Sequence, residues 1–156
     1  MGKHVYISGA LTGLSPEDAS KLKAFYERIG KICEGLHFDP YVPHLHSDPI
    51  AHAHFTPSEV DEIDRREVAK ADLIIAYVGA PSTGTGIEVE IAHHAGRPVV
   101  LMFEKDRAVS RLVRGNPAII YEIAFTDFGN AFEMLVAFLL ELTIKEQLRL
   151  NASVST

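Results

Sequence analysis

The chain of 156 residues has a single cysteine, more acidic than basic residues, and no apolar stretch long enough to span a bilayer. The lone Cys33 excludes a disulfide framework, and its helical apolar neighbours indicate a small buried side chain. A net charge of −6 argues against a nucleic-acid polymer as partner, because such partners usually require a basic face. The most apolar segment, 131–144, is too short and too acidic to cross a membrane, and no signal peptide is evident. We therefore expect a cytoplasmic protein with neither a membrane nor a nucleic-acid polymer as partner.

Two common nucleotide-binding patterns are also missing. The sequence contains no GK[ST], which excludes a Walker phosphate loop. Gly84 and Gly86 are followed by Glu88 and Val89, so the dinucleotide pattern GxGxxG is absent. No internal repeat, low-complexity segment or linker interrupts the chain. We therefore expect residues 1–149 to form one catalytic domain and residues 150–156 to form a loose C-terminal tail.

Patterns typical of strands and helices alternate along the chain. Apolar or β-rich runs predict strands at residues 4–8, 38–42, 72–78, 98–103 and 118–125. Capping residues and helical spacing predict helices at 15–36, 56–70, 86–95 and 127–148, with a long loop at 43–56. This alternation predicts a three-layer α/β protein of flavodoxin- or Rossmann-like fold, with a five-stranded parallel sheet in the order 2-1-3-4-5.

The turns after the first and third predicted strands share a composition that suits an anion. In this strand order the two turns, GALTG and PSTGTG, lie side by side at the carboxyl ends of the strands. Small residues let backbone N–H groups approach a phosphate, and the following helix adds its positive end. Glycine-rich turns also occur merely to reverse the chain, so this signal is weak by itself.

Three further side chains could bring chemistry to the same crevice. Glu88 begins the helix after the second turn, Tyr6 ends the first strand, and Asp64 lies in the helix before the third strand. Each also has a structural interpretation: a glutamate favouring the helix dipole, a core tyrosine, and a solvated charged face, respectively. Together, two carboxylates and a tyrosine suit cleavage of a glycosidic bond, where one carboxylate attacks the anomeric carbon and the other handles the leaving-group proton.

Four segments occur in a recognisable order: VYISGALTG, Asp64 followed by AKADLIIAYV, PSTGTGIEVEIAHHAGRPVVLM, and SRLVRG. Over roughly residues 3–125 this set resembles the nucleoside 2-deoxyribosyltransferase superfamily, and within it the nucleoside 5'-monophosphate N-glycosidases. The resemblance implies that Glu88 is the nucleophile, that Asp64 acts as acid near the leaving base, and that Tyr6 orients Glu88.

The residue at position 82 separates two branches of this superfamily. The transferases carry an aspartate there, six residues before the nucleophile, whereas Ser82 matches the monophosphate N-glycosidases. A serine hydroxyl can donate to a phosphate that an aspartate would repel. The resemblance assigns the phosphate to Gly9, Ala10, Leu11, Thr12, Ser82, Gly84, Gly86 and, from a neighbouring subunit, Ser110. A member of this branch has arginine where Thr12 stands, so Arg111 or Arg114 are candidates to assist.

These features favour a hydrolase that releases a free base and a sugar 5-phosphate from a nucleoside 5'-monophosphate, through a glycosyl-glutamate intermediate. A transferase that exchanges bases and a non-catalytic nucleotide-binding protein are the alternatives. The resemblance implies no cofactor and no metal, and it implies a homodimer or higher homo-oligomer with shared active sites. The sequence leaves open the base and the choice between ribose and deoxyribose.

Two segments have more than one interpretation. The loop 43–56 contains His44, His46, His52 and His54 in two H-x-H pairs, which could hold a metal ion. We favour a lid over the base, with His44 and His46 as base contacts, over plain solvent exposure. The segment 131–144 is apolar nearly all round, which fits either a subunit interface or a fully buried terminal helix.

Overall fold

The five-stranded sheet predicted from the sequence is present in the computed structural model, which describes residues 2–154. All strands run parallel, in the order β2-β1-β3-β4-β5. The strands are β1 (His4–Ser8), β2 (Asp39–Tyr41), β3 (Leu73–Tyr77), β4 (Val99–Glu104) and β5 (Ile119–Phe125). The helices are α1 (Pro16–Gly35), α2 (His44–Ser47), α3 (Pro57–Lys70), α4 (Thr83–His94), α5 (Arg111–Arg114) and α6 (Phe128–Val154).

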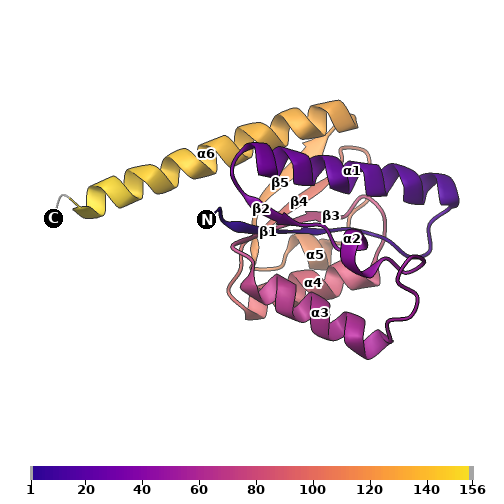
Figure 1. Ribbon diagram of the computed structural model, residues 1–156. Coiled ribbons are helices and arrows are strands. Elements are labelled where there is room, and N and C mark those ends of the chain that lie inside the picture. The colour runs from indigo at the N-terminus through magenta and orange to yellow at the C-terminus, as the bar shows by residue number, and fades with distance from the viewer. Residues whose placement is uncertain (1, 155–156) are drawn as a thin grey trace.

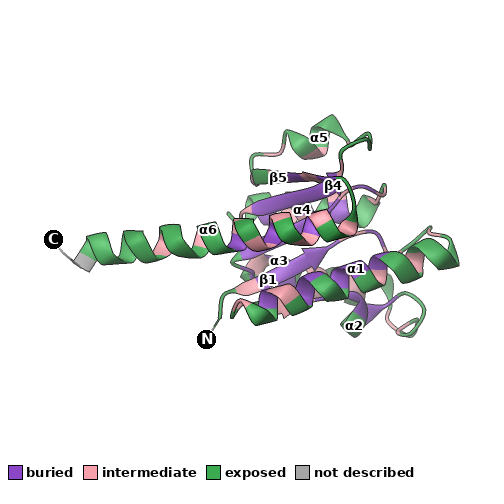
Figure 2. Cartoon of the chain, turned by 90° about the horizontal axis from the view of Figure 1, so that it is seen from above, coloured by how far each residue is buried: buried purple, intermediate pink, exposed green. Residues whose placement is uncertain are grey.

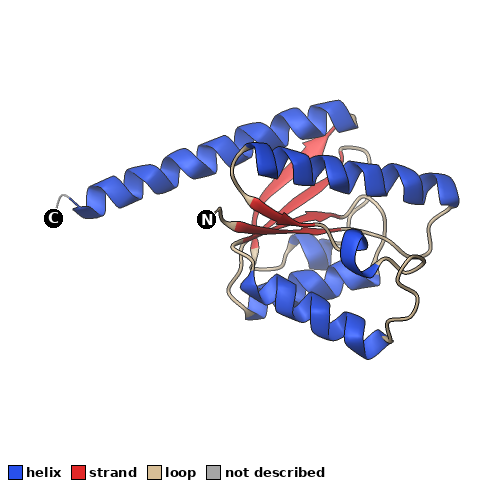
Figure 3. Cartoon of the chain, viewed as in Figure 1, coloured by secondary structure: helices blue, strands red, loops and turns tan. Residues whose placement is uncertain are grey.

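Helices cover both faces of the sheet, which confirms the three layers. Helices α1 and α6 lie on one face, and α3, α4 and α5 lie on the other (Figures 1 and 3). Successive strand residues point to opposite faces, so each face has its own apolar core. In β1, Val5 and Ile7 pack toward α1, whereas Tyr6 belongs to the core beneath α3 and α4. The side chains at positions 6 and 8 therefore face the helix that carries Glu88.

Capping residues fix where α1 and α3 begin, as the sequence predicted. The Ser15 side chain accepts a hydrogen bond from the backbone N–H of Asp18 and starts α1. Thr56 and Glu59 form a complete capping box at the start of α3. The predicted apolar face of α1 is buried, including Phe25 and Cys33.

Three helical segments differ from the predicted ones. Helix α4 begins at Thr83 rather than near residue 86, because the Ser82 side chain accepts from the N–H of Thr85 and caps the helix there. Gly84 and Gly86 are therefore helical residues and not part of a loop. Two short helices were not predicted: α2 occurs in the predicted loop 43–56, and α5 occurs in a segment to which no element was assigned.

The last helix is longer and less buried than its composition suggests. Helix α6 continues to Val154, whereas the sequence predicted a loose tail after residue 149; strong helix formers such as Leu150 and Ala152 carry the helix onward. Residues 155–156 of that predicted tail lie outside the described residues. Ala131, Leu135 and Leu139 are buried against the sheet, but the later part of the helix projects and is largely exposed (Figure 2). Within residues 2–154, no helix has both the length and the apolar character needed to cross a membrane.

Candidate active site

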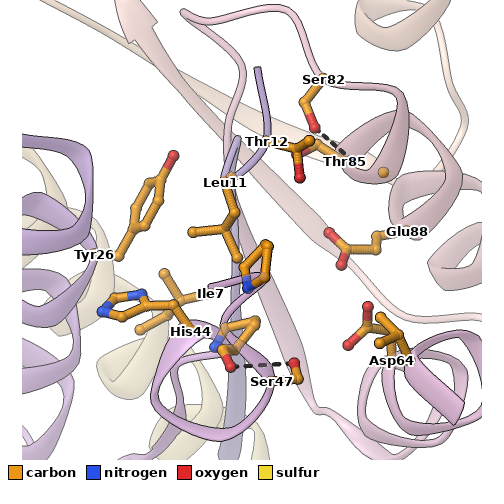
Figure 4. Close-up of a pocket in the computed structure, with 15 residues that line it drawn as sticks. Ile7, Leu11, Thr12, Tyr26, His44, Ser47, Asp64, Ser82, Thr85 and Glu88 are labelled. Atoms are coloured by element: carbon orange, nitrogen blue, oxygen red, sulfur yellow. Dashed lines mark hydrogen bonds between the residues drawn. The ribbon is translucent and has the colours of Figure 1, made fainter. Parts of the chain in front are cut away.

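A cavity of about 190 Å³ lies at the carboxyl ends of β1 and β3, where the strand order predicted a ligand site. The predicted site residues that line it are Gly9, Leu11, Thr12, His44, Asp64, Ser82, Gly84 and Glu88. Figure 4 shows Asp64 and Glu88 on one side of this cavity, with Tyr26 and His44 on the other. The cavity thus combines an acidic wall with the N-terminal turn of α4.

Two neutral hydroxyl groups hold the Glu88 carboxylate. The Tyr6 hydroxyl donates to Glu88 Oε1 over 2.7 Å, and the Ser8 hydroxyl donates to Oε2. Tyr6 and Ser8 share one face of β1 because they are two residues apart. Tyr6 is fully buried, and its ring stacks on Tyr41 with 5.6 Å between centroids. The carboxylate is therefore fixed by the rigid centre of the sheet.

The surroundings of Glu88 make it easier to protonate than an ordinary glutamate. Burial raises the pKa of Glu88 to about 7; the hydrogen bonds from Ser8 and Tyr6 oppose that shift, and the charge of Asp64 adds to it. Burial also raises the pKa of Tyr6 well above its ordinary value, so the phenol stays a neutral donor. A carboxyl group that titrates near neutral pH in a cavity is a candidate for chemistry.

Asp64 supplies the second carboxyl group, from α3. Burial raises the pKa of Asp64, the nearby Tyr6 hydroxyl lowers it, and the charges of Asp61 and Glu67 raise it further. Among the described residues, Asp64 Oδ1 is buried without a hydrogen-bond partner. Figure 4 shows the carboxyl groups of Asp64 and Glu88 facing the same cavity. The charge of Asp64 contributes to the raised pKa of Glu88, so the two carboxyl groups are electrostatically linked.

The turn of α4 next to Glu88 has the features of an anion site. Ser82 caps this 12-residue helix, whose N-terminus carries the positive end of the helix dipole. If a Cβ is placed on Gly84, the nearest atom of the described chain, apart from the adjacent residues and the helix backbone, is Ser82 Oγ at 3.9 Å. Packing within the chain therefore does not explain this glycine, which leaves open space beside the helix N-terminus. By contrast, a Cβ at Gly9 would lie 2.3 Å from the Tyr26 ring, so Gly9 is required by close packing.

Five predicted site residues do not line this cavity; one of them, Tyr6, acts on it through its hydrogen bond to Glu88. Ala10 is buried, and its carbonyl accepts from the Tyr26 hydroxyl over 3.0 Å. Gly86 and the exposed Ser110 line a neighbouring cavity of about 390 Å³, which shares Ser82 and Thr85 with the first. His46 is exposed and stacks on Tyr41, with 4.4 Å between ring centroids. The structure thus brings together the predicted carboxylates and most of the predicted phosphate residues, but not His46.

The other histidines of residues 43–56 have partners within the chain. His44 is buried, and its Nε2 lies 2.8 Å from Glu27 Oε1 in α1. His52 Nδ1 accepts from the N–H of Asp48, and the His54 ring packs 4.5 Å from the Phe55 ring. Among residues 2–154, no group of three or more His, Cys, Asp or Glu side chains is arranged to hold a metal ion.

Sequence reasoning missed one side chain of the site, Ser8. Ser8 follows Tyr6 by two residues, so the period of the strand was a signal that could have identified it. Thr85, which belongs to the predicted anion-binding turn PSTGTG, lines both cavities.

Comparison with known proteins now adds independent information. No family model matches the chain. A protein of Thermofilum pendens named "Putative 2'-deoxynucleoside 5'-phosphate N-hydrolase 1" is 36% identical over 90 residues, covering 54% of this chain and 61% of that protein. Two Methanosarcina proteins of the same name are 33% and 34% identical. The chain spans only 53–61% of the length of these relatives.

Two solved structures share the fold. The CMP N-glycosidase BcmB of Clostridium botulinum has a TM-score of 0.65 at 20% identity, over 87% of this chain and 99% of that one. A 2-deoxyribosyltransferase of Bacillus psychrosaccharolyticus has a TM-score of 0.61 at 16% identity, over 83% of this chain and 90% of that one. The resemblance predicted from the motifs is confirmed. At these identities the structural matches establish the fold, and the sequence matches connect the chain with proteins named as N-hydrolases.

Proposed function

We propose that this chain hydrolyses the N-glycosidic bond of a nucleoside 5'-monophosphate, releasing the free base and the sugar 5-phosphate. The observation that carries the proposal is the position of Glu88, which Tyr6 and Ser8 hold in one cavity with Asp64 and the capped N-terminus of α4. The names of the matched relatives agree with this activity.

In the proposed mechanism, the 5'-phosphate binds at the N-terminus of α4, beside Ser82 and Gly84, and next to the turn that follows β1. The ionised Glu88 attacks C1', and the bond from C1' to the base nitrogen breaks as Asp64 donates its proton to the base. This step forms a glycosyl ester on Glu88. Water then attacks C1', gives a proton to the Asp64 carboxylate, and releases the sugar 5-phosphate and the Glu88 carboxylate.

The reactive form of the enzyme has one proton on the pair of carboxyl groups, and that proton is on Asp64. Glu88 must be ionised to attack, and because its pKa is about 7 we expect kcat/KM to depend on pH near neutrality. Burial of Asp64 raises its pKa and so favours the protonated acid. The observed limbs of the pH profile would belong to the pair rather than to either residue alone.

A deoxyribosyltransferase is the main alternative. Ser82 favours the hydrolase, because a hydroxyl next to a helix N-terminus can donate to a phosphate. A non-catalytic nucleotide-binding protein is the second alternative, and it would have no need for a paired carboxyl at Glu88 and Asp64.

The decisive assay measures free base from ribo- and deoxyribonucleosides, each with and without a 5'-phosphate. We expect release from at least one monophosphate, and at least tenfold slower release from the matching nucleoside. Adding a second free base tests for exchange. Efficient base exchange on nucleosides would favour the transferase, and tight binding of a nucleotide without base release would favour the binding protein.

We further propose a homodimer or higher homo-oligomer in the cytoplasm. Exposed apolar side chains support an interface, including Leu112 on α5, which is 87% exposed, and Ile144 on α6, which is 59% exposed. Sedimentation of the purified protein measures its mass in solution, and a monomer at micromolar concentration would contradict this part of the proposal.

A further inference from the structure

Thr85 has a hydroxyl group that no contact within the described chain uses. The residue is only 3% exposed, and Thr85 Oγ1 is buried without a hydrogen-bond partner among residues 2–154. A buried hydroxyl without a partner destabilises the fold, so such groups usually meet water or a ligand. Thr85 lines both the candidate active site and the neighbouring cavity, so its side chain stands at the boundary between them.

The position of Thr85 along α4 relates it to the reaction. Ser82, Thr85 and Glu88 follow one another at intervals of three residues, which puts them on one side of the helix. Each interval corresponds to a rise of about 4.5 Å along the helix axis. Figure 4 shows Thr85 beside Ser82 and Thr12, at the end of the cavity away from Asp64. Thr85 therefore lies between the residue proposed to attack C1' and the capped helix N-terminus.

The chemistry at this end of the cavity suits an anion. The hydroxyl of Thr85 can donate one hydrogen bond, and the positive end of the α4 dipole adds to the attraction. The Thr85 backbone N–H is already used by Ser82 Oγ at 3.2 Å, so the side-chain hydroxyl is the donor that remains. Gly84 leaves open space next to these groups, because a Cβ there would meet little.

We propose that Thr85 is a further phosphate-binding residue, which donates its side-chain hydrogen bond to an oxygen of the substrate's 5'-phosphate group. This inference rests on the proposed function and specifies how the same site would distinguish a monophosphate from a nucleoside. Valine has the shape of threonine but lacks the hydroxyl, so Thr85→Val removes the donor with little change in volume. Thr85→Ser retains the donor, and Thr83→Val is a matched control at an exposed threonine in the same turn.

The first test measures binding of inorganic phosphate by calorimetric titration, in the absence of any nucleotide. We expect Thr85→Val to weaken phosphate binding about tenfold or more, because a hydrogen bond to a charged group is lost. Thr85→Ser and Thr83→Val should bind phosphate within about twofold of the unaltered protein. Equal phosphate affinity in the Thr85→Val variant and the unaltered protein would overturn the proposal, whether or not the chain proves to be an N-hydrolase.

The second test compares thermal unfolding without and with saturating phosphate. Without phosphate, Thr85→Val should melt at the same or a higher temperature, because it removes a buried hydroxyl that has no partner. With phosphate, the unaltered protein should gain more in melting temperature than the variant does. A variant that is destabilised without phosphate and gains as much from phosphate as the unaltered protein would assign Thr85 a purely structural role and overturn the inference. If a monophosphate is cleaved, the KM of Thr85→Val for it should also rise about tenfold, with KM for the nucleoside unchanged.

Discussion

Two glutamates on neighbouring helices, Glu67 of α3 and Glu88 of α4, are both shielded from water but have neighbours of different charge. Glu67 is 5% exposed and lies beside Lys70, with Nζ 2.7 Å from Oε2, and near Arg66 and His4. Burial alone would raise the pKa of Glu67, but its cationic neighbours outweigh burial and lower it. For Glu88, burial outweighs the two neutral donors and raises the pKa to about 7.

The comparison indicates that the charge of the neighbouring groups decides whether a shielded carboxylate is held ionised by the fold or is available for chemistry. Cations stabilise the ionised form of Glu67, above all the neighbouring Lys70 ammonium group. Neutral hydroxyls fix the position of Glu88 but leave its charge uncompensated, next to the second carboxyl group of Asp64. Such a carboxylate gains from a positive charge that develops at an attacked C1', whereas Glu67 already has its counter-ions.

Replacing the uncompensated carboxylate should have the largest effect. Glu88→Gln should reduce base release roughly 10³-fold or more, because the nucleophile is lost while the shape of the side chain is kept. The measurement is kcat/KM for the best monophosphate. Glu90→Gln, an exposed glutamate two residues along the same helix, is the matched control and should leave the rate within about twofold. Near-normal turnover by Glu88→Gln would rule out its proposed role.

Removing the second carboxyl group should have the next largest effect. Asp64→Asn should slow base release by about 10²–10⁴-fold, since the leaving base is no longer protonated. A nitrophenyl glycoside of the sugar 5-phosphate needs no proton on its leaving group, so we expect Asp64→Asn to recover most activity on it, while Glu88→Gln does not. The exposed Asp61→Asn serves as control. Equal losses on both substrates would contradict the role of Asp64 as acid.

Removing a neutral donor should alter the titration of Glu88 as well as its position. Tyr6→Phe should lower kcat/KM about tenfold, the value of one hydrogen bond to a charged group. The lost hydrogen bond normally lowers the pKa of Glu88, so the limb of the pH profile near neutrality should move to higher pH. An unchanged pH profile near neutrality would contradict the role of Tyr6 in setting the pKa of Glu88. Tyr121→Phe, at an exposed tyrosine of β5, should change neither quantity.

The smallest effects concern stability, and they have opposite signs for the two glutamates. The pKa of Glu88 is higher in the folded protein than in the unfolded chain, so protonation of Glu88 stabilises the fold. This contribution to the free energy of unfolding is present below about pH 4.5 and is lost as the pH rises through about 7. Glu88→Gln should therefore gain stability relative to the unaltered protein between pH 5 and pH 8, by about 2 kcal/mol. The pKa of Glu67 is lowered in the folded protein, so ionisation of Glu67 stabilises the fold. This contribution to the free energy of unfolding is present above about pH 4.5 and is lost as the pH falls.

Urea unfolding at pH 3.5, pH 5 and pH 8 measures both changes, because the Glu67 change falls between the first two values and the Glu88 change between the last two. Glu67→Gln should cost roughly 1–3 kcal/mol at pH 8, and the loss should narrow below pH 4.5. If Glu67→Gln and Glu88→Gln respond to pH in the same direction, the contrast between the two environments is wrong.

Much of the fold followed from the sequence because its strands and helices alternate with clear caps. The strand order alone brings the ends of β1 and β3 together, so the proximity of Tyr6 and Glu88 could be expected. The start of α4 could not be identified as easily, because Gly84 and Gly86 have poor intrinsic helix propensity and the Ser82 cap overrides it. The contact of His44 with Glu27 depends on how α1 packs beside α2, and one-dimensional patterns do not contain that information.

The most direct test of the account is the stereochemistry of the displaced sugar. Base release is run in water that contains methanol, and proton NMR identifies the anomer of the methyl glycoside. A covalent intermediate on Glu88 requires two successive inversions, so we predict net retention and the β-methyl glycoside from a β-nucleotide. The α-anomer would indicate direct attack by the solvent and would contradict a nucleophilic Glu88.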